Sequence, residues 1–310
     1  MATSRHHPAA AVPDARSGNW VDRFAPGWLK PYARLARWDR PIGFWLLFWP
    51  CGYSLALAAG SRGFSWIALT EMFVGAIAMR GAGCTLNDIV DAELDAKVTR
   101  TRARPIPSGQ VSKTQAAIFL ALQVVVGAAI VLTFNLLTIG LAIASLVLIA
   151  IYPFMKRITW WPQLFLGLAF SWGALLGWTS QTGTISLPAL VLYLGCIFWV
   201  IGYDTIYALQ DVEDDALAGI KSTARLFGDQ VKSWIATFYI AAVACWLIAA
   251  AFTGDVSIFV LTLIVPAGLL GWQVVTLEPG NPKSALRMFK ANNWVGLTLT
   301  AALLLQAMVR

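Results

Sequence analysis

Apolar runs of about twenty residues recur along nearly the whole chain, and this feature constrains the possible folds more than any other. A run of that length is enough for a helix to cross the hydrocarbon core of a bilayer. The 310 residues are 58% hydrophobic and 13% charged, whereas roughly a quarter of the residues in soluble domains are charged. The sequence therefore predicts an all-α, polytopic protein embedded in a lipid bilayer.

We predict nine membrane-spanning helices, at roughly 41–60, 64–86, 115–134, 136–153, 164–181, 187–209, 234–253, 257–276 and 291–309. Before the first of these spans the chain carries seven cationic residues and no apolar core of the kind found in a cleaved secretory signal. We therefore expect a flexible cytoplasmic tail over residues 1–33 and a single transmembrane domain over residues 34–310.

The net charge of +7 is distributed as in a membrane protein, not as in a protein that binds nucleic acid. If alternate loops face opposite sides, twenty cationic residues lie on the side of the N-terminus, and only Arg62 and Arg310 lie on the other. Lysine and arginine accumulate in cytoplasmic loops. The N-terminus is therefore expected in the cytoplasm, and the C-terminus on the opposite side.

Nine of the sixteen acidic residues fall in two clusters, each at the cytoplasmic end of a predicted span. The first cluster lies in "NDIVDAELD" (residues 87–95), and the second comprises "DVEDD" (residues 211–215) with Asp204 two helical turns earlier. Each is followed by a basic loop that contains glycine. Like charges one turn apart destabilise a helix, and a carboxylate at membrane depth costs about 2.5–3.5 kcal/mol. Such clusters need a compensating cation.

Spacing and ligand chemistry indicate that this cation is Mg²⁺. Asn87, Asp91 and Asp95 follow one another at intervals of four residues along one helical face, and Asp211 and Asp215 repeat that interval. Oxygen ligands without histidine or cysteine suit a hard ion. Mg²⁺ takes one or two protein carboxylates and completes its shell with water and phosphate oxygens. We therefore expect these five residues to hold Mg²⁺ around a phosphorylated ligand.

These motifs resemble those of the UbiA-type membrane prenyltransferases. Residues 87–95 are similar to the family's NDxxDxxxD motif, residues 211–215 to its DxxxD motif, and "YPFMK" (residues 152–156) to its YxxxK element. Longer strings, among them "RWDRPIGFWLLFWP" and "YDTIYALQDVEDDALAGIKSTARLFG", most resemble the members that prenylate 4-hydroxybenzoate. The resemblance runs from about Arg34 to Gly228. It implies a bundle of nine helices around a central cavity that opens to the cytoplasm.

The resemblance further implies an Mg²⁺-dependent transferase of ubiquinone biosynthesis. Such an enzyme moves a polyprenyl group from polyprenyl diphosphate to the ring carbon ortho to the hydroxyl of 4-hydroxybenzoate. The products would be 3-polyprenyl-4-hydroxybenzoate and diphosphate. The membrane would be the bacterial inner membrane, or the mitochondrial inner membrane in a eukaryotic host. No obligatory protein partner is indicated.

Within that resemblance, individual residues have expected roles. The expected contacts to the diphosphate oxygens are Arg100, Arg102, Arg104, Lys156 and Arg157, with Tyr152 as a hydrogen-bond donor. Asp204 would orient the phenol or accept the displaced ring proton. Arg80 or Arg40 would meet the benzoate carboxylate. Asp88 is a helical neighbour of the expected ligands and the weaker ligand candidate.

Two alternatives stay open at this point. A prenyltransferase of the same superfamily could use another acceptor, such as homogentisate, dihydroxynaphthoate, haem or a chlorophyll precursor. A transporter for divalent cations or phosphate could also carry acidic clusters, but it should place ionisable residues across the whole depth of the membrane. Here nearly all of them lie toward the cytoplasmic ends of the spans, which favours the enzyme.

Overall fold

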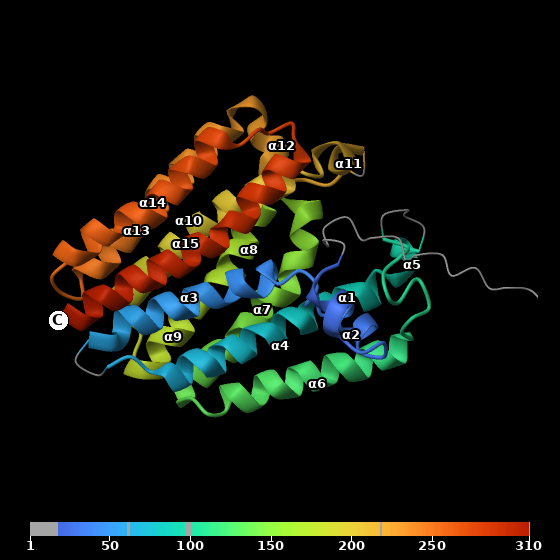
Figure 1. Ribbon diagram of the computed structural model, residues 1–310, viewed down its shortest axis with the longest axis horizontal. Coiled ribbons are helices and arrows are strands. Elements are labelled where there is room, and N and C mark those ends of the chain that lie inside the picture. Colours follow the sequence, from blue (N-terminus) through green and yellow to red (C-terminus); the bar gives the residue numbers. More distant parts are fainter. Residues whose placement is uncertain (1–17, 61–62, 97–100, 218, 310) are drawn as a thin grey trace, which may run out of the picture. The chain divides into compact units, whose positions relative to one another are not determined.

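The computed structural model of the chain describes residues 18–60, 63–96, 101–217 and 219–309 (Figure 1). Every regular element in these ranges is a helix, which confirms the predicted all-α fold. Seven helical segments there are long and apolar enough to cross a membrane: α3 (Ile42–Ala59), α4 (Trp66–Val90), α6 (Lys113–Val131), α7 (Leu136–Ile158), α10 (Leu187–Ala208), the segment Thr223–Ala251 that ends in α13 (Val231–Ala251), and α14 (Ser257–Thr276). The chain is a multi-pass membrane protein.

The predicted count of nine spans is not confirmed. The fifth predicted span consists of two ten-residue helices, α8 (Pro162–Ser171) and α9 (Gly173–Thr182). They meet at Trp172, whose indole Nε1 donates to the carbonyl oxygen of Leu141 in α7 at 2.9 Å. The ninth predicted span lies in α15 (Pro282–Val309), whose first turns are cationic and which also contains Asn292 and Asn293. These polar residues make α15 less apolar than the seven segments.

The structure has two compact units, and the single domain over residues 34–310 stays a prediction. The first unit comprises the described residues up to Phe44 together with Val74–Ile130. The second unit comprises Trp45–Phe73 together with Val131–Arg310. Each of the two acidic motifs belongs to a different unit.

The first unit begins with two short helices, α1 (Trp20–Phe24) and α2 (Lys30–Leu35). They lie largely within the predicted tail, whose residues 1–17 are outside the described part, so the predicted boundary at residue 34 falls inside α2. Helices this short are marginal alone and need tertiary contacts. Val21 is fully buried, and Leu35 belongs to a core cluster with Val111 and Ala116.

Helices α4 and α6 form an antiparallel pair in the first unit. A Cβ added at Gly75 would lie near Ile130, whereas one added at Gly127 would meet Met79. Nearer the end of α4, Gln123 of α6 donates from Nε2 to the Thr85 hydroxyl at 3.3 Å. Contacts at both ends of the pair fix the direction of α4, and with it the position of residues 87–91.

Helix α10 is the centre of the second unit and packs against α8, α13 and α15. Buried polar side chains join four of the helices. Trp199 of α10 donates from Nε1 to Asn292 Oδ1 at 2.7 Å, and Asn292 donates from Nδ2 to Gln273 Oε1 at 3.1 Å. The hydroxyl of Tyr239 in α13 donates to the same Gln273 oxygen at 2.9 Å. These hydrogen bonds across four helices favour one arrangement of the packed bundle.

Helices α3 and α9 approach closely because α9 carries glycine at two positions four residues apart. A Cβ at Gly173 would lie 3.1 Å from the backbone nitrogen of Cys51, and one at Gly177 would lie 2.7 Å from the Cys51 carbonyl oxygen. Small residues at such spacing allow membrane helices to come into backbone contact. This contact holds α3 against α9, the second of the two helices that form the fifth predicted span.

Candidate functional site

The first acidic motif lies where α4 ends and the short helix α5 (Ala92–Asp95) begins. The Asp91 N–H donates to the Asn87 carbonyl at 2.9 Å, and the Asp95 N–H donates to the Asp91 carbonyl at 2.8 Å. The helical repeat therefore continues through the bend at Asp91, and the three residues keep the predicted interval of four. Asn87 is exposed, Asp91 is half-buried and Asp95 is buried.

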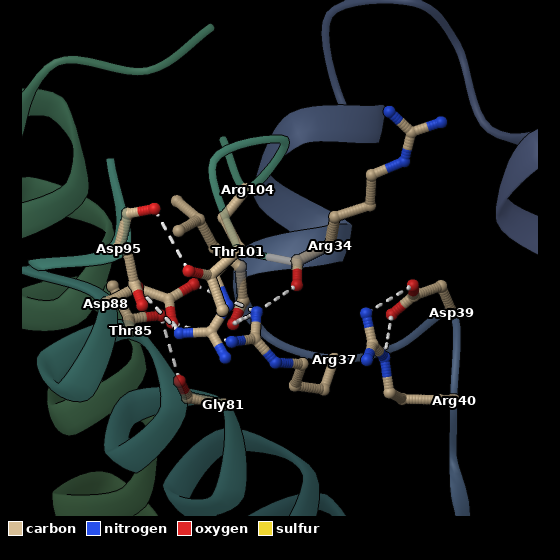
Figure 2. A network of polar contacts seen from close by, with 11 residues as sticks. Arg34, Arg37, Asp39, Arg40, Gly81, Thr85, Asp88, Asp95, Thr101 and Arg104 are labelled. Carbon is tan, nitrogen blue, oxygen red and sulfur yellow. Dashed lines mark hydrogen bonds and ion pairs between the residues drawn. The ribbon is translucent and has the colours of Figure 1, made fainter. Parts of the chain in front are cut away.

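Asp88 lies next to this motif but forms a different kind of contact. Its side chain is fully buried and forms a two-pronged ion pair with Arg37, from Nη1 to Oδ2 at 2.9 Å and from Nη2 to Oδ1 at 2.6 Å (Figure 2). Planar guanidinium–carboxylate pairs of this geometry are among the stronger ionic hydrogen bonds. The weaker ligand candidate of the sequence is thus the best-anchored acid of the motif.

Arg104 extends the pair into a network that reaches Asp95. Its Nη1 lies 3.3 Å from Asp88 Oδ1 and 2.6 Å from Asp95 Oδ2 (Figure 2). The Thr101 hydroxyl donates to the Asp95 carbonyl oxygen at 3.0 Å. The basic loop that follows the motif is therefore tied back onto it by side chains. Arg37, Asp88, Arg104 and Asp95 are called the arginine–aspartate network below.

The backbone of Arg37 has an uncommon conformation. Its φ is 58°, and it is the one non-glycine residue with positive φ among the described residues. Two hydrogen bonds close the end of α2, from the Trp38 N–H to the Ala33 carbonyl at 2.8 Å and from the Arg37 N–H to the Arg34 carbonyl at 3.2 Å. Glycine normally occupies this position, and a left-handed non-glycine residue costs about 1–2 kcal/mol.

The charge of Arg37 is stabilised despite its position. Burial of the guanidinium opposes the charged form, but the carboxylate of Asp88 and its hydrogen bonds outweigh this effect and raise the pKa of Arg37 above its ordinary value. The Arg37 side chain also donates to the Arg34 carbonyl oxygen at 2.8 Å. The guanidinium of Arg37 therefore stays charged although it is buried.

The second acidic motif repeats the local geometry of the first. Helix α10 ends at Ala208, and α11 (Val212–Leu217) begins directly after Asp211. The Asp215 N–H donates to the Asp211 carbonyl at 2.8 Å, as in the Asp91–Asp95 turn. Asp211 and Asp215 are half-buried, whereas Glu213 and Asp214 are exposed. The members of the cluster that share the predicted face are thus also the less exposed ones.

The basic loop of the second unit is tied to the end of α7. The Lys221 N–H donates to the Lys156 carbonyl at 2.9 Å, and Lys221 Nζ donates to the Ile158 carbonyl at 3.2 Å. Arg225 donates to the carbonyl oxygens of Asp215 and Ile220, and its guanidinium lies 5.3 Å from the ring centre of Trp160. The YxxxK element and the second acidic motif therefore lie at one end of the second unit.

The remaining predicted residues have these positions. Lys156 and Arg157 are exposed in the last turn of α7, and Tyr152 lies half-buried one turn earlier. Asp204 is half-buried on α10. Arg102 is exposed, and Arg100 lies outside the described residues.

The two candidates for binding the acceptor, Arg40 and Arg80, lie forty residues apart in the chain. Arg40 forms an ion pair with Asp39 at 3.3 Å. Arg80, on α4, contacts Gly43, where an added Cβ would lie 2.7 Å from Arg80 Nε. Both positions belong to the first unit.

The two acidic motifs offer oxygen donors in pairs. No group of three or more histidine, cysteine, aspartate or glutamate side chains that could hold a metal occurs within the described ranges. Asp95 Oδ2 already accepts a hydrogen bond from Arg104 Nη1. The pairs Asn87–Asp91 and Asp211–Asp215 each offer the one or two protein ligands that Mg²⁺ typically takes. The residues therefore fit Mg²⁺ bound mainly by water and phosphate, and not a cage of carboxylates.

Sequence reasoning missed three residues of these arrangements: Arg37, Arg225 and Trp160. Arg37 lies fifty-one residues from its partner Asp88, so no periodicity connects them. Arg225 lies in the short helix α12 (Thr223–Phe227) and Trp160 in the connection between α7 and α8, so they meet only through the fold. The available signal was the placement of Arg37 and Arg225 within strings that resemble the family.

Comparison with known proteins identifies the family. The model of the UbiA prenyltransferase family matches residues 47–296. The chain belongs to this family. It is 43% identical to the mitochondrial 4-hydroxybenzoate polyprenyltransferase of Arabidopsis thaliana, over 94% of this chain and 72% of that protein. It is 42% identical to 4-hydroxybenzoate geranyltransferase 1 of Lithospermum erythrorhizon, over 93% of this chain and 94% of that protein.

Solved structures support the same family fold. A UbiA homologue from Aeropyrum pernix K1 superposes with a TM-score of 0.69 and 25% identity, over 84% of this chain and 97% of that one. A UbiA homologue from Archaeoglobus fulgidus, solved with GPP and Mg²⁺ bound, gives a TM-score of 0.67 at 16% identity, over 88% of this chain and 99% of that one. The transporter alternative receives no support from these likenesses.

Proposed function

We propose that this chain transfers a polyprenyl group from polyprenyl diphosphate to the carbon ortho to the hydroxyl of 4-hydroxybenzoate, in ubiquinone biosynthesis. The observation that carries the proposal is a repeated arrangement. Each unit has two aspartates one turn apart, joined by a 2.8 Å backbone hydrogen bond, and an arginine from the segment that follows contacts the motif. Such an arrangement suits a diphosphate with its cations. The names of the relatives supply the acceptor.

The first acidic motif would hold Mg²⁺ through Asn87 and Asp91, with Asp95 as a further ligand, and the second through Asp211 and Asp215. Bound there, Mg²⁺ would neutralise charge on the diphosphate as it departs. Asp91, Asp211 and Asp215 are half-buried, which suits this role because a ligand must remain reachable by substrate and yet lie in a medium of lower dielectric constant than water.

The cationic side chains would stabilise the leaving diphosphate. Lys156 and Arg157 are exposed in the last turn of α7, which is hydrogen-bonded to the segment after the second motif, and they would contact the diphosphate oxygens. Arg102 and Arg104, with Arg100, would do so beside the first motif, and the Tyr152 hydroxyl would donate a further hydrogen bond. As the allylic C–O bond breaks, negative charge grows on diphosphate, and donors placed in advance stabilise that charge.

The aromatic acceptor then supplies the new bond. The ring carbon ortho to the hydroxyl donates its π electrons to the allylic carbon, and a C–C bond forms as the C–O bond is lost. The ring proton must then leave. Asp204 lies two turns before Asp211 on α10 and would orient the phenol or take that proton. Arg80 or Arg40 would bind the benzoate carboxylate.

We propose an inner membrane as the location, with the N-terminus in the cytoplasm or its mitochondrial equivalent and the C-terminus on the opposite side. The charge asymmetry of the loops supports the orientation. The resemblance implies a bacterial inner membrane, or the mitochondrial one in a eukaryotic host, and the relative from Arabidopsis thaliana is named as mitochondrial. The source of the chain decides between these two.

The proposal is tested by transfer of a labelled prenyl group to 4-hydroxybenzoate in membranes that contain this chain, with Mg²⁺ and then with EDTA. Asp91→Ala and Asp211→Ala are assayed in parallel. Product should require Mg²⁺ and fall by at least 100-fold in each variant, since removal of groups that act in the transition state typically costs this much. Glu213→Ala, which alters an exposed acid of the same cluster, is the matched control.

Two results would count against the proposal. Product formation that survives both aspartate substitutions would exclude the metal–diphosphate mechanism. A well-expressed chain that prenylates homogentisate or dihydroxynaphthoate but not 4-hydroxybenzoate, with several donor lengths tried, would assign a different acceptor.

A further inference from the structure

We propose that Arg37 is a positioning residue for the first acidic motif, and that Asp88 is its anchor and not a metal ligand. Through the arginine–aspartate network, Arg37 would fix the end of α4 and keep Arg104 in contact with Asp95. The inference rests on the proposed function, because it assigns the support of a motif whose metal role belongs to that function.

The contacts of Asp88 argue against a ligand role. Oδ2 accepts from Arg37 Nη1, and Oδ1 accepts from Arg37 Nη2 and also lies 3.3 Å from Arg104 Nη1. The residue is fully buried. On a helix Asp88 is turned by about 100° from Asn87, so its side chain projects away from the Asn87–Asp91 face. A carboxylate with both oxygens engaged by guanidinium groups is a structural anchor.

The strained backbone of Arg37 indicates that its side chain has a role that a glycine could not fill. Position 37 closes α2 in the left-handed region, where glycine is the unstrained residue. An arginine there sacrifices backbone stability, and its guanidinium then reaches a buried partner fifty-one residues away. Strained residues of this kind persist where the surroundings hold them, and they concentrate at functional sites.

The network transmits the position of Arg37 to the candidate ligands. Arg104 divides one guanidinium between Asp88 at 3.3 Å and Asp95 at 2.6 Å. Without Arg37, Arg104 would be the one arginine left beside the buried carboxylate of Asp88 among the described residues, and Asp88 would draw it away from Asp95. Asn87 directly precedes Asp88, so a shift of Asp88 would also displace Asn87 and Asp91.

The geometry suggests a substitution that removes the side chain of Arg37 without straining the backbone. Arg37→Gly removes the guanidinium but suits the left-handed backbone, so the turn at the end of α2 is retained. The matched control is Arg34→Gln in α2, which removes a more exposed pair with Asp22 at 2.9 Å and leaves the backbone carbonyl that Arg37 uses. A double variant, Arg37→Gly with Asp88→Asn, removes both charges of the pair.

The measurement is binding of Mn²⁺, a spectroscopic substitute for Mg²⁺, to the purified full chain in detergent, by electron paramagnetic resonance without prenyl donor or acceptor. Arg37→Gly should weaken Mn²⁺ binding by about 10- to 100-fold, the range found when residues that orient metal ligands are lost. Arg34→Gln should bind as the unaltered chain does. The double variant should recover to within about tenfold of the unaltered chain, because no buried carboxylate is left unpaired.

The outcomes separate this inference from the proposed function. Unchanged Mn²⁺ binding in Arg37→Gly would overturn it, as would a double variant that binds no better than the single one, since that result would make Asp88 a ligand. If Arg37→Gly does not fold, the double variant decides: near-normal binding supports the inference and lost binding overturns it. An unaltered chain that binds no Mn²⁺ overturns both the inference and the metal mechanism. Arg37-dependent Mn²⁺ binding without prenylation of 4-hydroxybenzoate overturns only the acceptor.

Discussion

At the scale of single residues, identical side chains have different fates within one turn of helix. Asp88 is fully buried against two arginines, whereas Asp91, three positions later, is half-buried. A buried charge without its partner is strongly destabilising, so Asp88 depends on Arg37 and Arg104. Asp91, as a proposed ligand, would instead have its charge compensated by a bound Mg²⁺. Residue type alone does not distinguish an anchor from a ligand.

Lys156 is exposed, and its proposed contact with the diphosphate depends on a single ammonium group. Lys156→Met should lower kcat/KM for polyprenyl diphosphate by about 10- to 100-fold, since a hydrogen bond to a charged group contributes roughly 1.5–3 kcal/mol. Lys156→Arg should retain most activity. Kinetics with varied donor concentration check this, with Lys283→Met as an exposed control elsewhere. Equal kinetics for Lys156→Met and Lys283→Met would remove Lys156 from the diphosphate site.

At the scale of elements, backbone conformation and side-chain packing determine where a helix ends, and a fall in hydropathy does not mark that residue. The sequence predicts one span over 164–181, but the structure has α8 and α9 meeting at Trp172. Glycine decides which helix surfaces touch. At Gly177 the Cys51 carbonyl lies 2.7 Å from an added Cβ, so a side chain there must separate α3 from α9.

Gly177→Ala should therefore destabilise the protein by about 1–3 kcal/mol, as overpacking typically does. Thermal unfolding of the purified chain, followed by a fluorescent thiol probe for its buried cysteines, would report this as a lower midpoint. Gly268→Ala is the matched control, because an added Cβ in that helical position meets nothing within 4 Å. If both variants unfold at the same temperature, the close approach of α3 and α9 does not contribute to stability.

At the scale of the whole molecule, the distribution of charge predicts a topology that the number of crossings must match. Twenty cationic residues on one side against two on the other predict the N-terminus in the cytoplasm and, if the chain crosses nine times, the C-terminus outside. Whether α15 crosses the membrane is central, because this helix is not among the seven apolar segments.

Fusions expressed in a bacterium test this topology. Alkaline phosphatase attached after Arg310 should be active and green fluorescent protein there should be dark, because the C-terminus is expected in the periplasm. Fusions after Gly280, between α14 and α15, should show the opposite pattern. The same pattern at both sites would mean that α15 does not cross, and the count of nine would be wrong.

The sequence by itself determined the all-α membrane class, the two acidic motifs and the family. Each depends on local quantities: the length of apolar runs, the interval of four residues, and strings of neighbouring residues. Only the tertiary structure decided which groups pair. Arg37 with Asp88, and Arg225 with Trp160, join residues that are 51 and about 65 positions apart. Their meeting depends on how helices pack, because long-range contacts leave no periodic trace in the chain.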